Sequence, residues 1–306
     1  MNKPTDDALR AISELLELLQ DELIVASETL PSTRCLSLTQ LKPIIKAAQA
    51  RLSAPVFRRH SAVKIVELLN GSGLLTPIPL EQRASKKLPD LFAIGFNLPA
   101  LPSAFEVLQA FRPNGVLCYF SALELHGLTT QVAPHYHVAT FRSNVHESET
   151  AIFAASDKTH SLGSPAFAYQ GVDCYVTTRD RRNLLAVQRR QLNSQSIARV
   201  TSLEQTLLDC LHRPASAGGA PVVFEAWAVG TQRVRPNLLW KILSDIDDVR
   251  LYRRAGYMLE INAGDPSLLL KIKERSDLDD TLHPPDALLP GIPYTNINNN
   301  WRLRTA

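Results

Sequence analysis

The segment at residues 112–140, RPNGVLCYFSALELHGLTTQVAPHYHVAT, constrains the fold more than any other stretch of similar length. Val116 to Phe120 is short and apolar, which indicates a strand. Ser121 then predicts a helix, because its hydroxyl can accept hydrogen bonds from the backbone amides of a first turn. Gly127 stands where a helix needs a left-handed residue at its end, and residues 135–139 alternate as a strand does. The segment therefore predicts a strand, a helix and a strand in close succession.

Length and composition favour a folded protein. At 306 residues the chain can bury two domains, and 45% hydrophobic with 21% charged residues is ordinary for a folded chain. No apolar run approaches the ~18 residues of a membrane span, and the polar N-terminus lacks an apolar signal core. The cysteines are widely spaced and form no CxxC pair, so we expect free thiols in a reducing cytoplasm. They are Cys35, Cys118, Cys174 and Cys210.

The net charge of +3 is small but unevenly distributed. Residues 1–34 hold three Lys/Arg against seven Asp/Glu. Residues 51–90 hold seven against three, and residues 179–199 hold six against one. Two basic regions therefore follow an acidic N-terminus, and a surface for phosphate is to be sought in them.

Residues 7–30 form the longest regular segment, with apolar residues at alternating steps of three and four. This spacing is the a/d register of a heptad and predicts a helix. Leu15, Leu18 and Val25 widen the stripe beyond a strict two-position seam. The stripe indicates either a helix packed on its own domain or a seam that pairs two copies into a homodimer. Its members are Leu9, Ile12, Leu16, Leu19, Leu23, Ala26 and Leu30.

The elements expected next follow the order of a winged helix-turn-helix. A helix is predicted over residues 38–52, and another begins after the capping residue Ser61 and ends at the glycines in 71–73. Residues 74–78 and 91–96 predict two strands joined by a basic loop. Three helices followed by a two-stranded ribbon with a basic tip favour a winged helix, whose last helix would enter the major groove of DNA.

The fold class is therefore α/β (α+β), with a winged-helix domain at residues 1–98 and a mixed α/β domain at residues 99–282. Residues 283–306 are rich in Pro and Asn and predict a loosely ordered C-terminal tail.

Local signals place further elements in the second domain. Ser103 and Glu106 form a capping box that opens a helix. Thr201 and Glu204 form another. Gly171 predicts a turn within an alternating strand segment at residues 166–177. Further helices are expected at residues 203–211, 221–229 and 236–246, and one within the basic region at 179–199.

Two segments of the second domain resemble a known family. The residues SALELHGLT at 121–129, followed by a strand, resemble the AbiEi-type antitoxins of bacterial abortive-infection (type IV toxin–antitoxin) systems. The residues RVTSLEQTLLDCLHRP at 199–214 are similar to the RVTxxERTLLDCL helix of that family. The segments match in order and spacing, and the resemblance covers roughly residues 110–257. It implies a DNA-binding antitoxin for phage defence that represses its own operon at the promoter and opposes a nucleotidyltransferase-like toxin.

One group of basic residues lies at the start of the expected recognition helix and at the tip of the wing. Arg suits paired hydrogen bonds to guanine, and Lys suits phosphate. The alternative is a solvated basic surface without a partner. The candidate DNA-binding residues are Arg58, Arg59, His60, Lys64, Arg83, Lys86 and Lys87.

A second basic group surrounds a helix expected within residues 179–199. It is a candidate surface for the toxin or for further DNA, or a solvated helix face. Its members are Arg179, Arg181, Arg182, Arg189, Arg190 and Arg199.

Histidines are concentrated around the first family-like segment. His135 and His137 lie two apart and would share one strand face, the spacing of two metal ligands. No nearby Cys pair or carboxylate completes a zinc pattern, so we predict no metal and no cofactor. His126 is expected to form hydrogen bonds beside the Gly127 turn.

The segment VGTQRVRPNLLWKILSDIDDV nearly fits a nucleotidyltransferase pattern, with Asp245 and Asp247 as the paired carboxylates. However, Thr231 replaces a small residue, and the carboxylates end a segment that reads as helix. No other catalytic motif is present, so we predict that the chain is not an enzyme. The alternatives to an antitoxin are a stand-alone winged-helix transcriptional regulator without a toxin partner, and a nucleotidyltransferase or nuclease.

Overall fold

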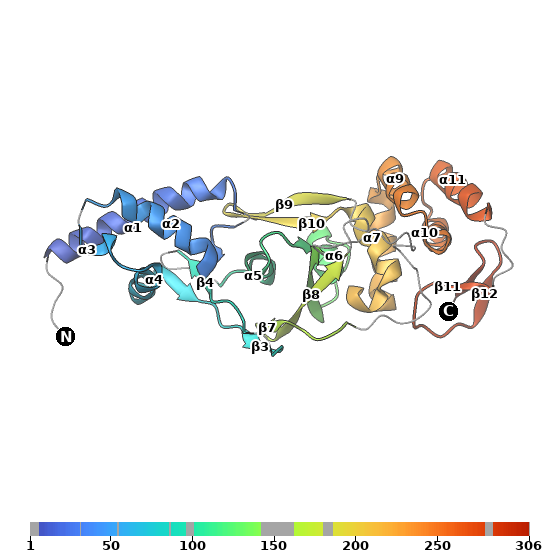
Figure 1. The fold of residues 1–306 in the computed structure, drawn as a ribbon. Helices are drawn as coiled ribbons and strands as arrows, with labels where there is room; N and C mark the ends of the chain where they lie inside the picture. Colours follow the sequence, from blue (N-terminus) through green and yellow to red (C-terminus); the bar gives the residue numbers. More distant parts are fainter. Residues whose placement is uncertain are drawn as a thin grey trace, which may run out of the picture. The chain divides into compact units, whose positions relative to one another are not determined.

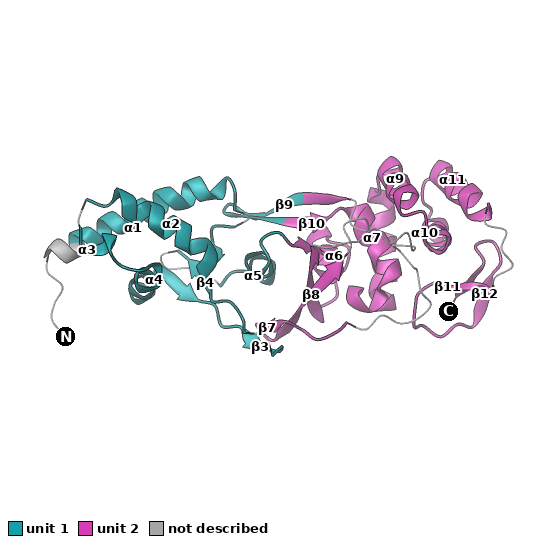
Figure 2. Cartoon of the chain, viewed as in Figure 1, with its two compact units in different colours: residues 1–114, 189–198 teal, residues 115–188, 199–306 magenta. Residues whose placement is uncertain are grey.

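The computed structural model describes residues 6–30, 32–53, 55–85, 87–95, 101–141, 162–179, 186–278 and 284–305, and it confirms the α+β class. Its residues group into two units, coloured separately in Figure 2. Unit 1 comprises residues 1–114 and 189–198, and unit 2 comprises residues 115–188 and 199–306. Helix α5 (Ala104–Phe111) belongs to unit 1, beyond the boundary expected after residue 98. The reason is a network in which the Glu106 carboxylate accepts hydrogen bonds from Asn193 and Ser196 of the same unit.

Unit 1 begins with helices and contains a small antiparallel sheet (Figure 1). Both outer strands pair with β4 (Leu91–Ile94), so that Cys35 and Thr76 lie opposite Ala93 on its two sides. The sheet order is β1-β4-β2. The other elements are α1 (Asp6–Ser27), β1 (Cys35–Ser37), α2 (Leu38–Arg51), α3 (Pro55–Arg58), α4 (Ala62–Gly71), β2 (Leu75–Pro77) and β3 (Glu81–Gln82).

Local hydrogen bonds define the helix starts in unit 1. Ser37 caps α2 by accepting from the Gln40 amide, and the Gln40 side chain accepts from the Ser37 amide in return. Ser61 caps α4 as predicted, accepting from the Lys64 amide at 3.2 Å. The capping box of Ser103 and Glu106 at the start of α5 is also confirmed.

Helix α1 packs on its own unit. Ala11, Leu15 and Leu19 are buried in one core with residues of α2 and α4. Most of the stripe noted in the sequence therefore packs on this core, with Leu16 half-buried beside it, but Val25 does not. Ile24 and Val25, near the end of α1, are 70% and 62% exposed.

The strands β7-β8-β6-β5-β10-β9 follow one another in a mixed sheet that lies mostly in unit 2, while residues 189–198 of β9 and β10 are assigned to unit 1. Strands β6 and β8 pair in parallel over their whole shared length, from His135 opposite Asp173 to Phe141 opposite Arg179. Gly171, at φ +79, forms the predicted turn between β7 and β8. The strands are β5 (Val116–Leu117), β6 (His135–Phe141), β7 (Phe167–Tyr169), β8 (Val172–Arg179), β9 (Val187–Asn193) and β10 (Ser196–Thr201).

The segment at 112–140 forms the predicted strand, helix and strand, with one correction. Helix α6 (Phe120–His126) ends at Gly127, whose φ of +61 and ψ of 43 are the left-handed conformation expected there. Ser121 is not the cap of this helix. Its buried hydroxyl lies within α6 and accepts a hydrogen bond from the backbone amide of His137 at 2.7 Å. This bond connects the helix to β6.

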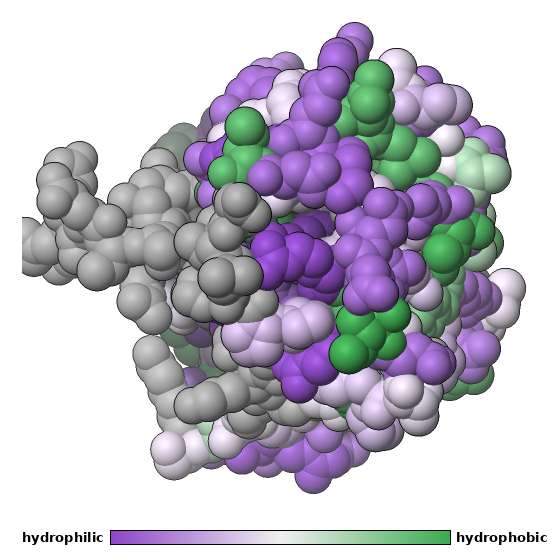
Figure 3. Space-filling model, turned by 90° about the vertical axis from the view of Figure 1, so that its right-hand side faces the viewer, coloured by the Kyte–Doolittle hydropathy of each residue, from purple (hydrophilic) through white to green (hydrophobic). Residues whose placement is uncertain are grey.

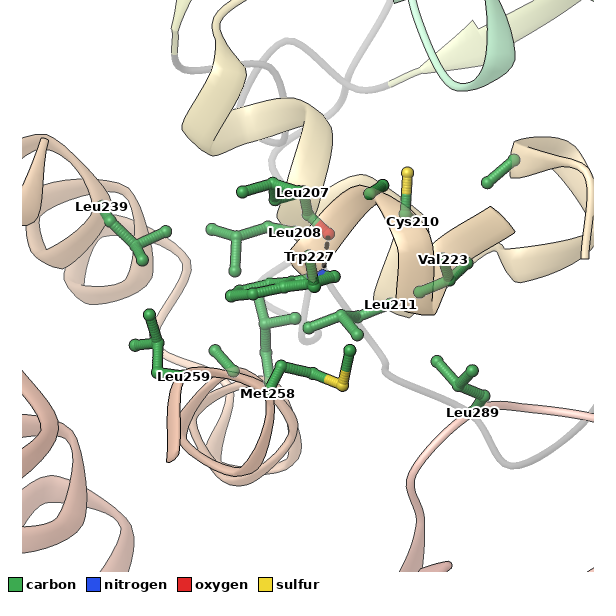
Figure 4. Packing of buried hydrophobic residues seen from close by; sticks show 14 of the residues in the cluster. Leu207, Leu208, Cys210, Leu211, Val223, Trp227, Leu239, Met258, Leu259 and Leu289 are labelled. Carbon is green, nitrogen blue, oxygen red and sulfur yellow. Dashed lines mark hydrogen bonds between the residues drawn. The ribbon is translucent and has the colours of Figure 1, made fainter. Parts of the chain in front are cut away.

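Helices of unit 2 surround one large apolar core, which contains Trp227 on α8 and, from α6, Phe120 and Leu123. The Trp227 ring lies between Leu207 and Leu208 of α7 and Met258 of α10, and its Nε1 donates to the Leu207 carbonyl at 3.2 Å (Figure 4). The other helices are α7 (Leu203–His212), α8 (Ala220–Gly230), α9 (Pro236–Ile246), α10 (Val249–Ile261) and α11 (Pro266–Asp277). No described helix is long and apolar enough to cross a membrane.

The start of α7 differs from the prediction by one residue. Ser202, and not Thr201, caps the helix by accepting from the Gln205 amide. Glu204 is buried. It accepts two hydrogen bonds from the Arg235 guanidinium, at 2.9 and 3.0 Å.

Residues 284–305 contain three short strands, where the sequence predicted a loosely ordered tail at 283–306. Strands β11 (Asp286–Ala287), β12 (Asn296–Asn298) and β13 (Leu303–Thr305) form a small sheet. Trp301 and Leu303 are 2% and 0% exposed. The apolar residues of this segment complete the core of unit 2, which composition alone does not reveal.

Candidate nucleic-acid interface

A buried amide fixes the connection between helices α2 and α4. Gln49 on α2 is 7% exposed, and its Nε2 donates to the carbonyls of Phe57 at 2.7 Å and of His60 at 3.0 Å. The turn that contains α3 is thereby held on α2, and α4 starts in a defined direction from it. Sequence reasoning missed Gln49, because its partners lie 8 and 11 residues away, beyond the reach of helical periodicity.

The three basic residues that precede α4 have different environments. Arg58 lies in α3, where its Nε and Nη2 both donate to the carbonyl of Leu52 at the end of α2. This guanidinium therefore satisfies a helix terminus. His60 is half-buried and packs edge-on against Phe57, with ring centroids 5.5 Å apart. Arg59 is exposed and has no partner among the described residues, so it is the accessible cation of this group.

Helix α4 buries one side and exposes the other. Ile65, Val66 and Leu69 face the core of unit 1. Val63 is 46% exposed, because it precedes Ile65 by two residues and so lies about 200° around the helix. The exposed face consists of Val63, Lys64, Glu67, Leu68 and Asn70.

The charges on this face are paired within the helix. Lys64 Nζ lies 3.0 Å from Glu67 Oε2, and both side chains are more than half exposed. An exposed pair of this kind contributes at most ~1 kcal/mol, so Lys64 can be redirected to another anion at low cost.

The loop between β2 and β4 exposes the predicted basic wing residues. Arg83 is exposed and lies 3.1 Å from Glu81 of β3. Lys87 is also exposed. Lys86 lies outside the described residues. The accessible cations of unit 1 in this region are therefore Arg59, Lys64, Arg83 and Lys87.

The second basic group is not one surface. Arg179 at the end of β8 is buried, and its guanidinium binds both carboxylate oxygens of Asp209 on α7, at 2.5 and 2.7 Å. It cannot contact a partner without breaking this pair, so its place on the predicted surface is wrong. Arg181 and Arg182 lie outside the described residues.

Residues 187–201 form a β-ribbon, β9 and β10, where the sequence was expected to form a helix. Arg189 is exposed and Arg190 half-buried on β9, and Arg199 is half-buried on β10. The prediction failed because the segment has strong charge but no Gly or Pro to mark its turn, which falls at Ser194 and Gln195.

His135 and His137 share one face of β6 as predicted, with ring centroids 4.8 Å apart. His135 Nε2 is within hydrogen-bonding distance of the Ser216 carbonyl, and the His137 ring stacks on Tyr175. His137 Nε2 is buried without a hydrogen-bond partner among the described residues. His126 bonds through Nε2 to the Thr201 carbonyl at 2.7 Å, so its expected hydrogen-bonding role is confirmed.

The buried histidine pair should make the protein less stable in acid. Burial, the neighbouring His135 and Arg213 lower the pKa of His137 from 6.5 to about 3. The unfolded chain therefore binds the proton more readily than the folded protein. The contribution of neutral His137 to the free energy of unfolding is fully present above pH 6.5 and is lost as the pH falls toward 3. We expect His137 to lower the free energy of unfolding by about 2 kcal/mol between pH 7 and pH 5.

Denaturant unfolding of wild type and His137→Phe at both pH values measures this contribution. Part of the slope should remain in the variant, because burial also lowers the pKa of His135. An identical pH slope in the two proteins would contradict the assignment to His137.

Asp245 and Asp247 do not lie together on a strand. Asp245 is on α9 and pairs with Lys241 at 2.5 Å, whereas Asp247 follows the helix and is bound by Arg275 at 2.7 Å. This is the acidic helix end expected from the sequence.

Comparison with known proteins gives a likeness in fold. No family model matches the chain, and no curated protein matches it. A solved structure, the RV2827C protein from Mycobacterium tuberculosis, is similar with a TM-score of 0.53 at 14% sequence identity. The match covers 94% of this chain and 90% of that chain, so both units take part in the likeness.

Proposed function

We propose that unit 1 binds double-stranded DNA as a winged helix-turn-helix and that the protein represses its own promoter. The observation that carries this proposal is the element order α1, β1, α2, α4, β2, β4 with the sheet order β1-β4-β2. In a winged helix the helix before the ribbon enters the major groove, and the loop between the ribbon strands contacts the adjoining backbone. In this proposal α4, which precedes β2, is the helix for the groove, and residues 78–85 and 87–90 between β2 and β4 belong to the wing.

The side chains available at these positions suit the task. Arg59 and Lys64 lie before and in the first turn of α4, the part of such a helix that reaches base edges. Val63 adds an exposed apolar group of the kind that contacts a thymine methyl. Arg83 and Lys87 would bind phosphates without reading sequence. Arg58 is left out of this set, because its guanidinium holds the end of α2.

We further propose that this DNA binding serves a cytoplasmic antitoxin that opposes a nucleotidyltransferase-like toxin. The support is the resemblance of residues 121–129 and 199–214 to AbiEi-type antitoxins. These segments meet in the fold, where His126 of α6 bonds to the Thr201 carbonyl and Phe120 shares a core with Leu207. Because the two segments pack against each other, we expect proteins that share this fold to have both of them. The four cysteines are free and buried, as a reducing compartment permits.

Two variants should separate base contact from phosphate contact. In Arg59→Ala/Lys64→Ala each lost base contact should weaken binding by ~1–3 kcal/mol. In Arg83→Ala/Lys87→Ala the slope of log K against log salt should fall by about 1 for each phosphate contact removed. Fluorescence anisotropy with the protein's own upstream DNA, across a salt series, measures both quantities.

The matched control is Lys241→Ala/Lys271→Ala, which removes two exposed lysines from unit 2. Its affinity and salt slope should equal those of the wild type. If the helix and wing variants also kept wild-type affinity and slope, unit 1 would not bind DNA through α4 and the wing, and the proposal would fall.

A further inference from the structure

Strand β9 lies at the edge of its sheet. It is last in the strand order, and no described strand pairs with the side of its backbone that faces away from β10. None of its seven residues is buried, because both faces of the ribbon are at least partly in solvent. An unpaired edge of this length presents donors and acceptors that can add another strand.

Two of the usual protections of such an edge, a proline and a glycine bulge, are missing from β9. Its sequence, VQRRQLN, has no Pro and no Gly, so neither a lost donor nor a glycine bulge interrupts it. On the face drawn in Figure 3 the apolar residues lie in separate patches between hydrophilic ones.

The tip of the ribbon is rigidly held within unit 1. Glu106 is 2% exposed and accepts hydrogen bonds from Ser196 at 2.6 Å and Asn193 at 3.0 Å. Ser196 also bonds to Ser32, and Thr33 donates its amide to the Gln195 carbonyl. A strand fixed at its end is preorganised, which reduces the entropy lost when another strand is added.

The charge of this edge selects the partner. Residues 186–203 contain three Arg and no Asp or Glu. Arg189 and Arg190 have no ion-pair partner among the described residues, so their positive charge is not neutralised within the fold. A second copy of this chain is a poor occupant, since two β9 edges would bring like charges face to face.

The position of β9 argues against the duplex that α4 would bind. Within unit 1 the ribbon tip joins the segment after α1, through Ser32 and Thr33. Helix α4 instead packs with α2 and β2, and Figure 1 shows α4 and the ribbon on different sides of this unit.

We propose that the outer edge of β9 at residues 189–193 binds an extended acidic segment of a partner protein as an added strand. The backbone of the edge supplies the ladder, and Arg189 and Arg190 select acidic side chains at the positions across from them. This proposal is independent of DNA binding by unit 1.

The probe is a blocked peptide of alternating Glu and Val, matched in length to β9, added to the full chain. We expect the amide NMR signals of residues 189–193 to shift and the peptide to bind. Arg189→Glu/Arg190→Glu should weaken binding by about tenfold or more, because the arginine on the face of the peptide's glutamates becomes repulsive and the net charge of the edge reverses. Arg189→Gln/Arg190→Gln gives the same test with neutral side chains if the first variant melts early.

Three comparisons make the result specific. A Lys–Val peptide and an acidic peptide with a central Pro should not bind, since the first has the wrong charge and the second cannot complete the ladder. Arg83→Glu/Lys87→Glu, which alters equally basic exposed residues of unit 1, should leave peptide binding unchanged. Equal binding of the proline peptide, equal binding by the Arg189 and Arg190 variants, or displacement of the acidic peptide by duplex DNA would each overturn the proposal.

Discussion

Asp209→Ala should destabilise unit 2 by about 3–5 kcal/mol, because it leaves the Arg179 guanidinium buried without its counter-charge. The side chains of Arg179 and Asp209 are 6% and 1% exposed. Burial alone would lower the pKa of Arg179, but the Asp209 carboxylate and its hydrogen bonds raise this pKa above its usual range. Gln205 donates to the same carboxylate at 2.9 Å, and the guanidinium lies over the Tyr119 ring. The pair joins β8 to α7.

Denaturant unfolding measures the loss, with Asp245→Ala as the control. Asp245 also accepts from a cation, Lys241, but the pair is exposed, so its removal should cost less than ~1 kcal/mol. Replacing both partners, as in Arg179→Met/Asp209→Leu, should restore much of the stability, because no unpaired charge then remains. Similar small losses in Asp209→Ala and Asp245→Ala would mean that the buried pair does not hold β8 on α7.

Trp301→Ala should cost a comparable amount, about 3–5 kcal/mol, because it opens a cavity between α10 and the C-terminal sheet. The indole is 2% exposed, and its Nε1 donates to Glu260 at 2.7 Å. It lies directly on Gly256 of α10, where an added Cβ would approach the ring carbons to 2.2 Å.

Gly256→Ala should therefore destabilise the protein by ~1–3 kcal/mol, although alanine is the better helix former.

Gly71→Ala is the matched control for the glycine change. Gly71 is also helical, but an added Cβ there meets no atom within 4 Å. Thermal melts should show a neutral or slightly stabilising effect for Gly71→Ala and a clear loss for Gly256→Ala. If Gly256→Ala and Trp301→Ala both melted like the wild type, the C-terminal residues would not form part of the core.

Local chemistry made part of the fold predictable. Ser61 and the pair Ser103 with Glu106 cap helices through residues three positions away, and Gly127 and Gly171 occupy turns that need a positive φ. These interactions involve residues only a few positions apart, so the sequence alone predicts them.

The predictions that were wrong concern residues whose partners lie far away in the sequence. Ser121 bonds to the His137 amide on β6, and Glu204 bonds to Arg235, 31 residues away. Arg179 is buried against Asp209, 30 residues away, although its neighbours in sequence suggested an exposed basic surface. Charge counts indicated where cations are abundant, but tertiary packing decides which of them remain accessible.

Nor could the candidate site be read fully from charge. Arg59 and Arg58 are adjacent, yet only the position of the Leu52 carbonyl distinguishes the free guanidinium from the occupied one. Gln49, which holds the turn before α4, has no charge and no motif.

The route of the chain has a consequence for dissecting the protein. Residues 1–114 and 189–198 form one unit, so the chain leaves this unit and returns to it later. A fragment that ends at residue 114 would lack Asn193 and Ser196 and would leave the Glu106 carboxylate without two of its donors. No single cleavage or gene truncation separates intact halves, and the two units are therefore expected to be inherited as one piece.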